Sequence, residues 1–373
     1  MKVKPAYILF ALWLVVQLIL WVTNGTVTTN EALKYIGQAY HLQQQHQLDG
    51  TKYIFYLVPV CVIYACIILR AGFNAVVLIQ LLLNAIATAA FYKICLTLFS
   101  NKARSFAATA LLITFIPLQY WNSFLYTESL FYSFCILFIY CYTVLPPSKK
   151  STHAARAVIT LVLLFTRPLG ILFLPVTAFY YLWQSRLRFI TKLLVLVATC
   201  MAAAVLINYL YSGGADMDIL MPQRNGFIVC YGDSLPHTGI KTIDTGSPLN
   251  GLLYFIFHNP LYFSRLAFYR LLSFFTLTRS YYSPLHNLYL GCCMFFLYVP
   301  AVISVIISPL KKQNIFGYLF LPLLLLFCIG VMLQCDDFNS RFCMPLFPFI
   351  ILLAVDGLFT IYNRVNKTKS PQA

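Results

Sequence analysis

The sequence predicts an all-α, polytopic membrane protein with about ten transmembrane helices and further helices lying in the membrane plane within external loops. Hydrophobic residues make up 61% of the 373 residues and charged residues only 10%, against roughly 25% charged in a typical soluble domain. Apolar runs of about 17–25 residues, long enough to cross a bilayer as helices, recur along the whole chain. The runs lack the alternating pattern of a membrane β-barrel, which leaves helices as the spanning structure.

Basic residues set the predicted topology. The formal net charge is +16, but lysine and arginine fall in short clusters between the apolar runs. Such clusters mark cytoplasmic loops, so no nucleic acid is expected among the partners. Lys2 and Lys4 predict a cytoplasmic N-terminus, followed by a retained first helix because residues 5–22 show no cleavage pattern. The other predicted cytoplasmic clusters are Lys102/Arg104, Lys149/Lys150/Arg156, Arg186/Arg188, Lys311/Lys312 and Arg364/Lys367/Lys369.

Stretches with acidic residues or with many Gly, Pro and Asn residues lie between these clusters and should face outside. They are 23–52, 122–128, 212–262 and 334–341. Two apolar stretches, 53–69 and 260–278, would each add one crossing too many between an external loop and the next basic cluster. We therefore predict that both lie in the outer interface or dip into the membrane and return.

The predicted spans belong to one membrane domain, 1–373. They are 6–22, 73–93, 105–121, 129–145, 157–167, 169–183, 190–211, 288–308, 314–333 and 343–361. The fifth and sixth form a hairpin broken at Arg167–Pro168, because proline disrupts a helix and disfavours helical geometry in the residue before it. Around the spans we expect a first external loop (23–72) with an in-plane helix, central spans (73–211), a second long external loop (212–287), last spans (288–361) and a basic cytoplasmic tail (362–373).

The cysteines and histidines do not form a metal or redox framework. Most of the twelve cysteines lie in apolar runs, and no Cys-x-x-Cys or His-x-x-x-His pair occurs. Buried packing is the favoured interpretation of these cysteines. Cys230 and Cys335 fall in predicted external loops, where one disulfide between them is compatible with the sequence. No cofactor is predicted, although a divalent metal ion remains compatible with the residues present.

Arg167 lies inside an apolar stretch. A charge within a span costs about 2.5–3.5 kcal/mol on insertion scales, so we expect the side chain to face the protein interior or a wet cavity and to find an anion. One interpretation is a structural ion pair with an acid such as Glu128. The other is a phosphate, whose oxygens suit the planar guanidinium fork.

Three other polar sites break the apolar pattern, and each has a plain structural interpretation. Glu31 follows the cap-forming residues 28–30 and could simply start a helix, as could Glu128 at the next external turn. Asp336 and Asp337 could keep a short loop in water. Arg341, at a predicted helix mouth, could extend to the membrane interface.

Taken together, these sites resemble the GT-C glycosyltransferases, multi-spanning enzymes that use polyprenyl-phosphate sugars, and most closely the bacterial members related to protein mannosyltransferases and aminoarabinose transferases. The resemblance extends over roughly residues 6–361. The matching motifs are Glu31-x-x-x-Tyr35, Pro117 followed by Tyr126-Thr127-Glu128, Arg167-Pro168-x-Gly170, Tyr281–Asn287, and Arg341-Phe342-x-x-Pro345-Leu346-x-Pro348. The chain departs from many members in having Glu rather than Asp in the first loop, and no proline before Pro59 in the stretch that follows.

The resemblance implies an inverting transfer at the outer face of the plasma (inner) membrane. A sugar would pass from a polyprenyl-phosphate donor to a hydroxyl of a glycan, lipid or protein acceptor, with Glu31 as the catalytic base. Arg167 and Arg341 would bind the donor phosphate. The residues that would contact the acceptor or support the site are Tyr35, Glu128, Asp337 and His286.

Such an enzyme should bring Glu31, Glu128, Arg167 and Arg341 to one outward cavity. The main alternative is a membrane transporter or lipid flippase, whose site would lie nearer the middle of the membrane. A third possibility is an inactive membrane scaffold.

Overall fold

The computed structural model describes residues 4–211, 220–236, 239–243, 247–307 and 315–369, and these ranges are predominantly helical with isolated β-bridges. The first half contains α1 (Pro5–Asn24), α2 (Glu31–Gln45), η1 (Thr51–Tyr56), α3 (Leu57–Ile68), α4 (Phe73–Phe99), α5 (Lys102–Thr114), α6 (Ile116–Gln119), η2 (Tyr120–Ser123), α7 (Glu128–Thr143), α8 (Lys150–Leu164), η3 (Pro168–Leu172), α9 (Phe173–Gln184) and α10 (Phe189–Tyr211). The second half contains α11 (Met221–Arg224), α12 (Pro248–His258), α13 (Pro260–Thr276), α14 (Pro284–Ile307), η5 (Phe316–Phe320), α15 (Leu321–Leu333), η6 (Arg341–Leu346) and α16 (Phe347–Lys369).

Seven helical segments in the described ranges are long and apolar enough to cross a membrane, as in an α-helical integral membrane protein. They are Pro5–Asn24, Thr51–Ile68, Phe73–Phe99, Phe189–Tyr209, Pro284–Ile307, Phe316–Leu333 and Arg341–Asn366. The other predicted spans correspond to shorter helices: α5 with α6, α7, α8 and α9. The count of about ten therefore stays a prediction.

The predicted break in the hairpin at Arg167–Pro168 is confirmed. Helix α8 ends at Leu164, and Arg167 is extended before the short turn η3 that leads into α9. Gly170 is required in this turn, because a Cβ atom there would lie 1.9 Å from the carbonyl oxygen of Leu163. The break therefore depends on proline for its position and on glycine for its close packing.

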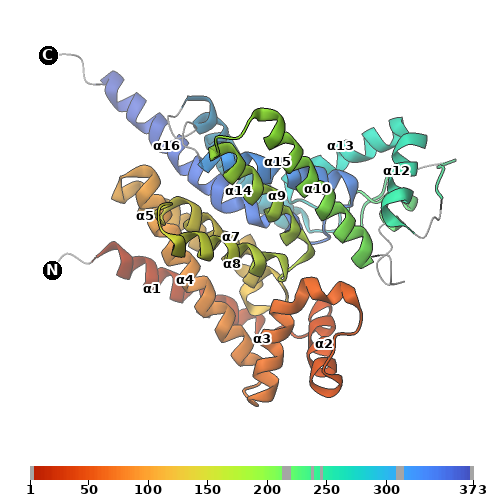
Figure 1. Ribbon diagram of the computed structural model, residues 1–373. Helices are drawn as coiled ribbons and strands as arrows, with labels where there is room; N and C mark the ends of the chain where they lie inside the picture. The colour runs from red at the N-terminus through yellow and green to blue at the C-terminus, as the bar shows by residue number, and fades with distance from the viewer. Residues whose placement is uncertain (1–3, 212–219, 237–238, 244–246, 308–314, 370–373) are drawn as a thin grey trace.

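The stretch 51–68 differs from the expectation for 53–69, since its length and composition are those of a span. Its predicted outer placement stays a prediction. The Val58 N–H donates to the Phe165 carbonyl at the broken hairpin (3.0 Å). Helices α2 and α3 lie together near the start of α4, away from α5 and both chain termini (Figure 1). Helix α13, in the stretch 260–278, is not among the seven long apolar segments.

Both chain termini lie at one side of the molecule, whereas α2, α3, α12 and α13 lie toward the other (Figure 1). The start of α1 and the end of α16 therefore lie apart from these four helices. Helices α2 and α12, which belong to the predicted external loops 23–52 and 212–262, lie on the side away from the termini.

A buried polar network holds the first helices together. The Asn122 amide donates to Gln17 Oε1 (2.9 Å) and Gln119 Oε1 (3.1 Å). Its carbonyl accepts from the Ser129 hydroxyl (2.7 Å) and from the Tyr132 hydroxyl. In an apolar environment each of these groups needs a protein partner. The network thereby fixes α1, η2 and the first turns of α7 relative to one another.

Cys230 and Cys335 form a disulfide with a Cα–Cα distance of 5.2 Å. The Cys230 N–H donates to the Asp336 carbonyl (2.8 Å), and the Asp336 N–H donates to the Ile228 carbonyl (2.9 Å). Nearby, Arg270 of α13 is fully buried and donates only to backbone carbonyls among its described contacts, including that of Phe227 (2.8 Å). These bonds join the loop before η6 to the segment after α11.

Helices α14 and α16 pack side by side, and one tight contact between them predicts a sensitive position. A Cβ atom on Gly357 would lie 1.9 Å from the Pro300 carbonyl oxygen, whereas one on Gly330 would meet nothing within 4 Å. We expect Gly357→Ala to separate the two helices and reduce stability by about 1–3 kcal/mol. Thermal unfolding in detergent should show a lower midpoint for this variant and little change for Gly330→Ala. Equal midpoints would contradict the close approach.

Candidate functional site

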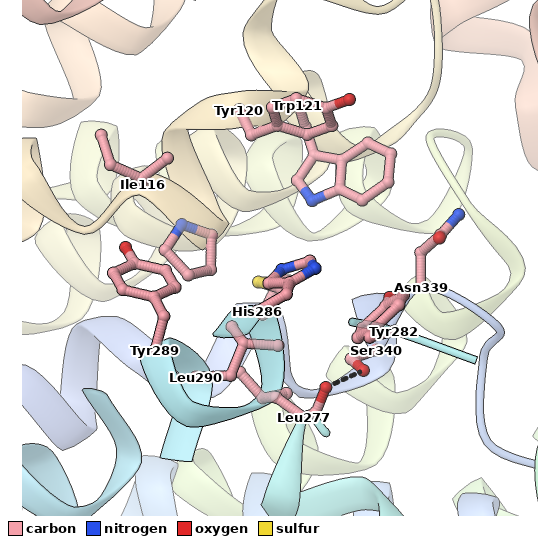
Figure 2. A pocket seen from close by; sticks show the side chains of 12 residues that line it. Ile116, Tyr120, Trp121, Leu277, Tyr282, His286, Tyr289, Leu290, Asn339 and Ser340 are labelled. Carbon is pink, nitrogen blue, oxygen red and sulfur yellow. Dashed lines mark hydrogen bonds between the residues drawn. The ribbon is translucent and has the colours of Figure 1, made fainter. Parts of the chain in front are cut away.

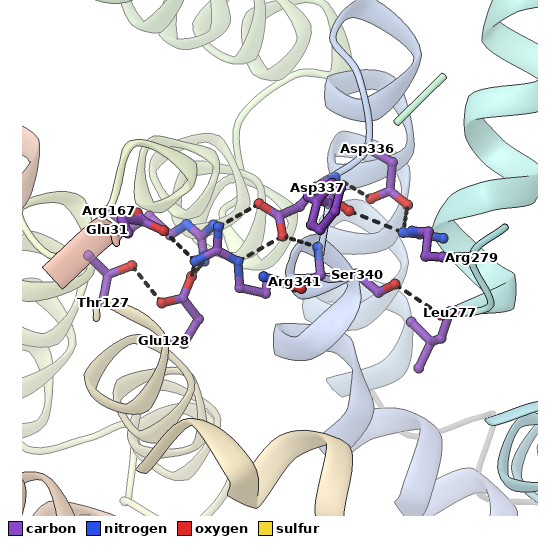
Figure 3. Close-up of polar contacts among 12 residues, drawn as sticks. Glu31, Thr127, Glu128, Arg167, Leu277, Arg279, Asp336, Asp337, Ser340 and Arg341 are labelled. Atoms are coloured by element: carbon purple, nitrogen blue, oxygen red, sulfur yellow. Dashed lines mark hydrogen bonds and ion pairs between the residues drawn. The ribbon is translucent and has the colours of Figure 1, made fainter. Parts of the chain in front are cut away.

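Arg341 is the centre of a buried ion cluster (Figure 3). Its Nε and Nη2 atoms donate to the two carboxylate oxygens of Asp337, at 2.7 and 2.8 Å. Its Nη1 atom donates to Glu31 Oε2 (2.5 Å) and to Glu128 Oε1 (2.8 Å). Arg167 Nη1 also donates to Glu128 Oε1, at 2.6 Å. Two arginines and three carboxylates thus form one connected group, which we call the Arg341 cluster.

Helix ends bring these residues together. Glu31 is the first residue of α2 and Glu128 is the first residue of α7. Arg167 directly precedes η3, and Arg341 is the first residue of η6. Each side chain therefore lies where a helix begins or breaks. Glu31, Glu128, Arg167 and Arg341 do meet, although their sequence separations reach 310 residues. That they share one outward cavity stays a prediction.

The anion that meets Arg167 in the structure is Glu128, as in the structural interpretation of this arginine. The guanidinium also lies over the Phe342 ring, with its carbon 5.3 Å from the ring centroid. Both partners are buried, so each charge depends on the other. This pairing does not assign a ligand to Arg167.

Two structural interpretations of the late motif are wrong. Arg341 does not extend to an interface, since it is buried and its guanidinium lies near the rings of Trp121 and Tyr126. Asp336 and Asp337 do not solvate a loop, since both are buried in ion pairs. Asp337, to which the resemblance gave only a role in contacting the acceptor or supporting the site, is the carboxylate that holds Arg341 through two oxygens.

Glu31 is the accessible carboxylate of the Arg341 cluster. Its side chain is 28% exposed, against 1% for Glu128 and 11% for Asp337. The hydroxyl of Tyr35, one turn later in α2, donates to Glu31 Oε1 at 2.5 Å. Tyr35 is itself fully buried, so this bond fixes the direction of the carboxylate. An incoming group can therefore reach Glu31 more easily than the other two acids.

The cluster favours the ionised forms of Glu31 and Asp337. Burial raises the pKa of Glu31, but the charges of Arg341 and Arg167 and the hydrogen bonds of Tyr35 and Arg341 outweigh it, leaving the pKa below its ordinary value. Burial and the Arg341 charge oppose each other in the same way at Asp337, and its pKa is also lowered. Both acids therefore add stability that is present above their unfolded pKa of about 4 and is lost as the pH falls through the lower folded values.

A second buried ion pair supports the loop that carries Asp337, and sequence reasoning missed it. Arg279 Nη2 donates to Asp336 Oδ2 (2.5 Å) and to the Asp337 carbonyl (3.2 Å). Asp336 also accepts from the Ser273 hydroxyl (3.0 Å). Arg279 lies just before the Tyr281–Asn287 motif. Its position beside this aromatic motif was the sequence feature that could have marked it as a candidate.

A mainly aromatic and aliphatic cavity of about 400 Å³ lies beside the Arg341 cluster. Tyr120 and Trp121 line one side, and Tyr282, His286 and Tyr289 face them from the other (Figure 2). Trp121 also contacts the Arg341 guanidinium, so the cavity and the cluster share a wall. His286 stacks on Tyr282 with a centroid distance of 4.5 Å. It lines the cavity and makes none of the cluster's hydrogen bonds.

Within the described part of the chain, no group of three or more His, Cys, Asp or Glu side chains is arranged to hold a metal ion. Comparisons of the chain with protein-family models, characterised proteins and solved structures yield no match. The site must therefore be interpreted from its own geometry.

The Arg167–Glu128 pair predicts a stability defect that a second change repairs. Arg167→Leu leaves a buried carboxylate with one partner fewer, and we expect a loss on the order of 3–5 kcal/mol. Adding Glu128→Gln removes the stranded charge and should recover part of this loss. Thermal unfolding of the single and double variants checks the prediction, with Asp49→Asn, an exposed acid, as the control. Additive losses in the double variant would contradict direct pairing.

Proposed function

We propose that the chain is a membrane glycosyltransferase similar to the GT-C enzymes. It moves a sugar from a polyprenyl-phosphate carrier to a hydroxyl of a glycan, lipid or protein acceptor, with inversion at the anomeric carbon. The observation that carries this proposal is the Arg341 cluster. This cluster joins residues from four distant segments through direct hydrogen bonds. The same residues had been selected by their resemblance to a transferase.

Glu31 is the proposed base. Its carboxylate accepts the proton of the acceptor hydroxyl as the hydroxyl oxygen bonds to the anomeric carbon. The bond from that carbon to the donor phosphate breaks, and the prenyl phosphate leaves as an anion without a general acid. Glu31 suits this role because it is the most exposed and is ionised, whereas Glu128 and Asp337 hold the arginines in place. Tyr35 keeps the base oriented.

Positive charge near the leaving phosphate stabilises the transition state. Arg167 is a candidate, since only its Nη1 atom donates to a carboxylate among the described contacts. Arg341 meets three carboxylates and contacts a phosphate only by releasing one of them. The neighbouring cavity supports a lipid-linked donor because its lining is mostly apolar and it begins at Trp121, against Arg341. His286 in this cavity is available to a ligand that enters it.

We further propose that the site faces the outside of the plasma (inner) membrane, with both termini in the cytoplasm. The basic pair Lys102/Arg104 lies at the start of α5, on the same side of the molecule as the start of α1 (Figure 1), whereas the Arg341 cluster is at the starts of α2, α7 and η6. The disulfide between Cys230 and Cys335, close to Asp336, supports an oxidising compartment on the site's side.

Removal of the proposed base gives the direct test of activity. Glu31→Gln keeps the size of the side chain but cannot accept the proton, so we expect turnover to fall by roughly 10²–10⁴-fold. The measurement is sugar transfer by the purified protein from a polyprenyl-phosphate sugar. Asp49→Asn, an exposed acid beyond α2, should retain full turnover. Near-normal turnover of Glu31→Gln would remove Glu31 from catalysis. Absence of transfer by the unaltered protein with every donor tested would favour the transporter.

Orientation is testable with single cysteines. Ala71 and Ala103 are both exposed, in the turn before α4 and at the start of α5. In a background whose free thiols are replaced but whose disulfide is kept, we expect a membrane-impermeant thiol reagent to label Ala71→Cys on intact cells. Ala103→Cys should react only after permeabilisation. The opposite labelling would show that the site faces the cytoplasm.

A further inference from the structure

Lys34 has an unusual environment close to Glu31. It lies on α2, one turn after Glu31, and is half-buried. Its ammonium nitrogen is 4.1 Å from the ring centroid of Tyr56, 5.6 Å from that of Tyr35 and 5.7 Å from that of Tyr53. Three tyrosine rings therefore surround one lysine at the edge of the Arg341 cluster. We call these three rings and Lys34 the Lys34 cage.

The Lys34 charge has no carboxylate partner within ion-pair distance among the residues that the structure describes. Glu31, the nearest acid in the sequence, directs its oxygens to Tyr35 and Arg341 instead. Aromatic rings attract a cation, but they replace only part of its lost hydration. Burial, together with the charges of Lys52, Arg167 and Arg341, outweighs the opposing Glu31 charge and lowers the pKa of Lys34 to about 8. A bound anion would stabilise the charged form of Lys34.

The arginines are less suited to receive that anion. Arg341 directs Nε, Nη1 and Nη2 to carboxylates, so a new anion must displace an existing one. Arg167 is tied to Glu128 through Nη1. Lys34, in contrast, offers three donors on a flexible stem, and its described contacts are with rings. Of these three cations, Lys34 is the one that donates to no carboxylate among the described contacts.

We propose that the Lys34 cage binds the phosphate of the ligand, and that Arg341 organises the carboxylates instead of contacting this phosphate. The ligand class is a phosphate ester with an apolar chain, and its identification as the sugar donor rests on the proposed function. Lys34 holds the phosphate next to Glu31, where the anomeric carbon of such a donor must lie for transfer. The tyrosine rings cover the apolar part of the ester next to its phosphate.

Binding to the purified full-length protein in detergent tests this role without an activity assay. The probe is farnesyl methyl phosphate, a phosphodiester with one constant negative charge. Farnesol supplies the chain without the charge, and inorganic phosphate supplies the charge without the chain. We expect Lys34→Gln to weaken binding of the diester by about tenfold to a hundredfold, as for loss of a charge-assisted hydrogen bond. Lys34→Arg should bind within a few-fold of the unaltered protein.

A control variant and a protection experiment separate a specific loss of binding from a folding defect. Lys93→Gln, an exposed lysine on α4, is the matched control and should bind the diester normally. In the unaltered protein, the diester should protect Lys34 from an amine-reactive reagent, which gives an answer even where Lys34→Gln fails to fold. Farnesol should protect weakly or not at all. Inorganic phosphate that protects as well as the diester would identify a free phosphate as the ligand.

Unchanged diester affinity in Lys34→Gln, or unprotected Lys34 in the unaltered protein, would overturn the proposal and leave the cage as a structural cation–π contact. These outcomes are separate from the transferase test. A protein that binds the diester through Lys34 but transfers no sugar would retain this site and lose the proposed enzymatic function. A protein that depends on Glu31 for transfer but not on Lys34 for binding would do the reverse.

Discussion

The rest of the site depends on the guanidinium of Arg341. It is buried and holds Asp337 through two oxygens while also bonding Glu31 and Glu128. A buried charge of this kind is tolerated only where opposite charges and hydrogen bonds satisfy it. The same requirement applies in reverse to the three carboxylates. Glu31, Glu128 and Arg341 start α2, α7 and η6, and Asp337 lies in the loop before η6, so their ion pairs fix how those helix ends meet.

Support for Arg341 comes from several independent contacts. Trp121 and Tyr126 contribute rings near its guanidinium, and Arg279 fixes the preceding loop through Asp336. The disulfide at Cys335 joins that same loop to the segment after α11. The positions of Asp337 and Arg341 are thus determined before any ligand arrives. Glu31 lies at the more exposed edge of the cluster, next to the Lys34 cage, and these are the parts to which we assign the ligand.

Sequence reasoning located most of the cluster because charge is rare in this chain and each charged residue within an apolar context demands a partner. The break at Arg167–Pro168 was predictable from local proline geometry. Partner choice was not, since whether Asp336 or Asp337 bonds Arg341 depends on the turn between them and on Arg279 from a distant segment. The stretch 51–68 shows another limit, because an interfacial helix and a short span share the same composition. Lys34 was overlooked because its three rings come together only in the folded chain.

The most direct measurement is the coupling between Glu31 and Arg341, which are 310 residues apart in sequence and 2.5 Å apart in the structure. A double-mutant cycle with Glu31→Gln, Arg341→Gln and the double variant, followed by reversible unfolding in mixed micelles, measures it. A direct ion pair predicts an interaction free energy of about 0.5–3 kcal/mol. The double variant should then lose less stability than the two single variants lose in total. Additivity within about 0.3–0.5 kcal/mol would show that the two side chains do not meet, and would contradict the convergence on which the proposed active site rests.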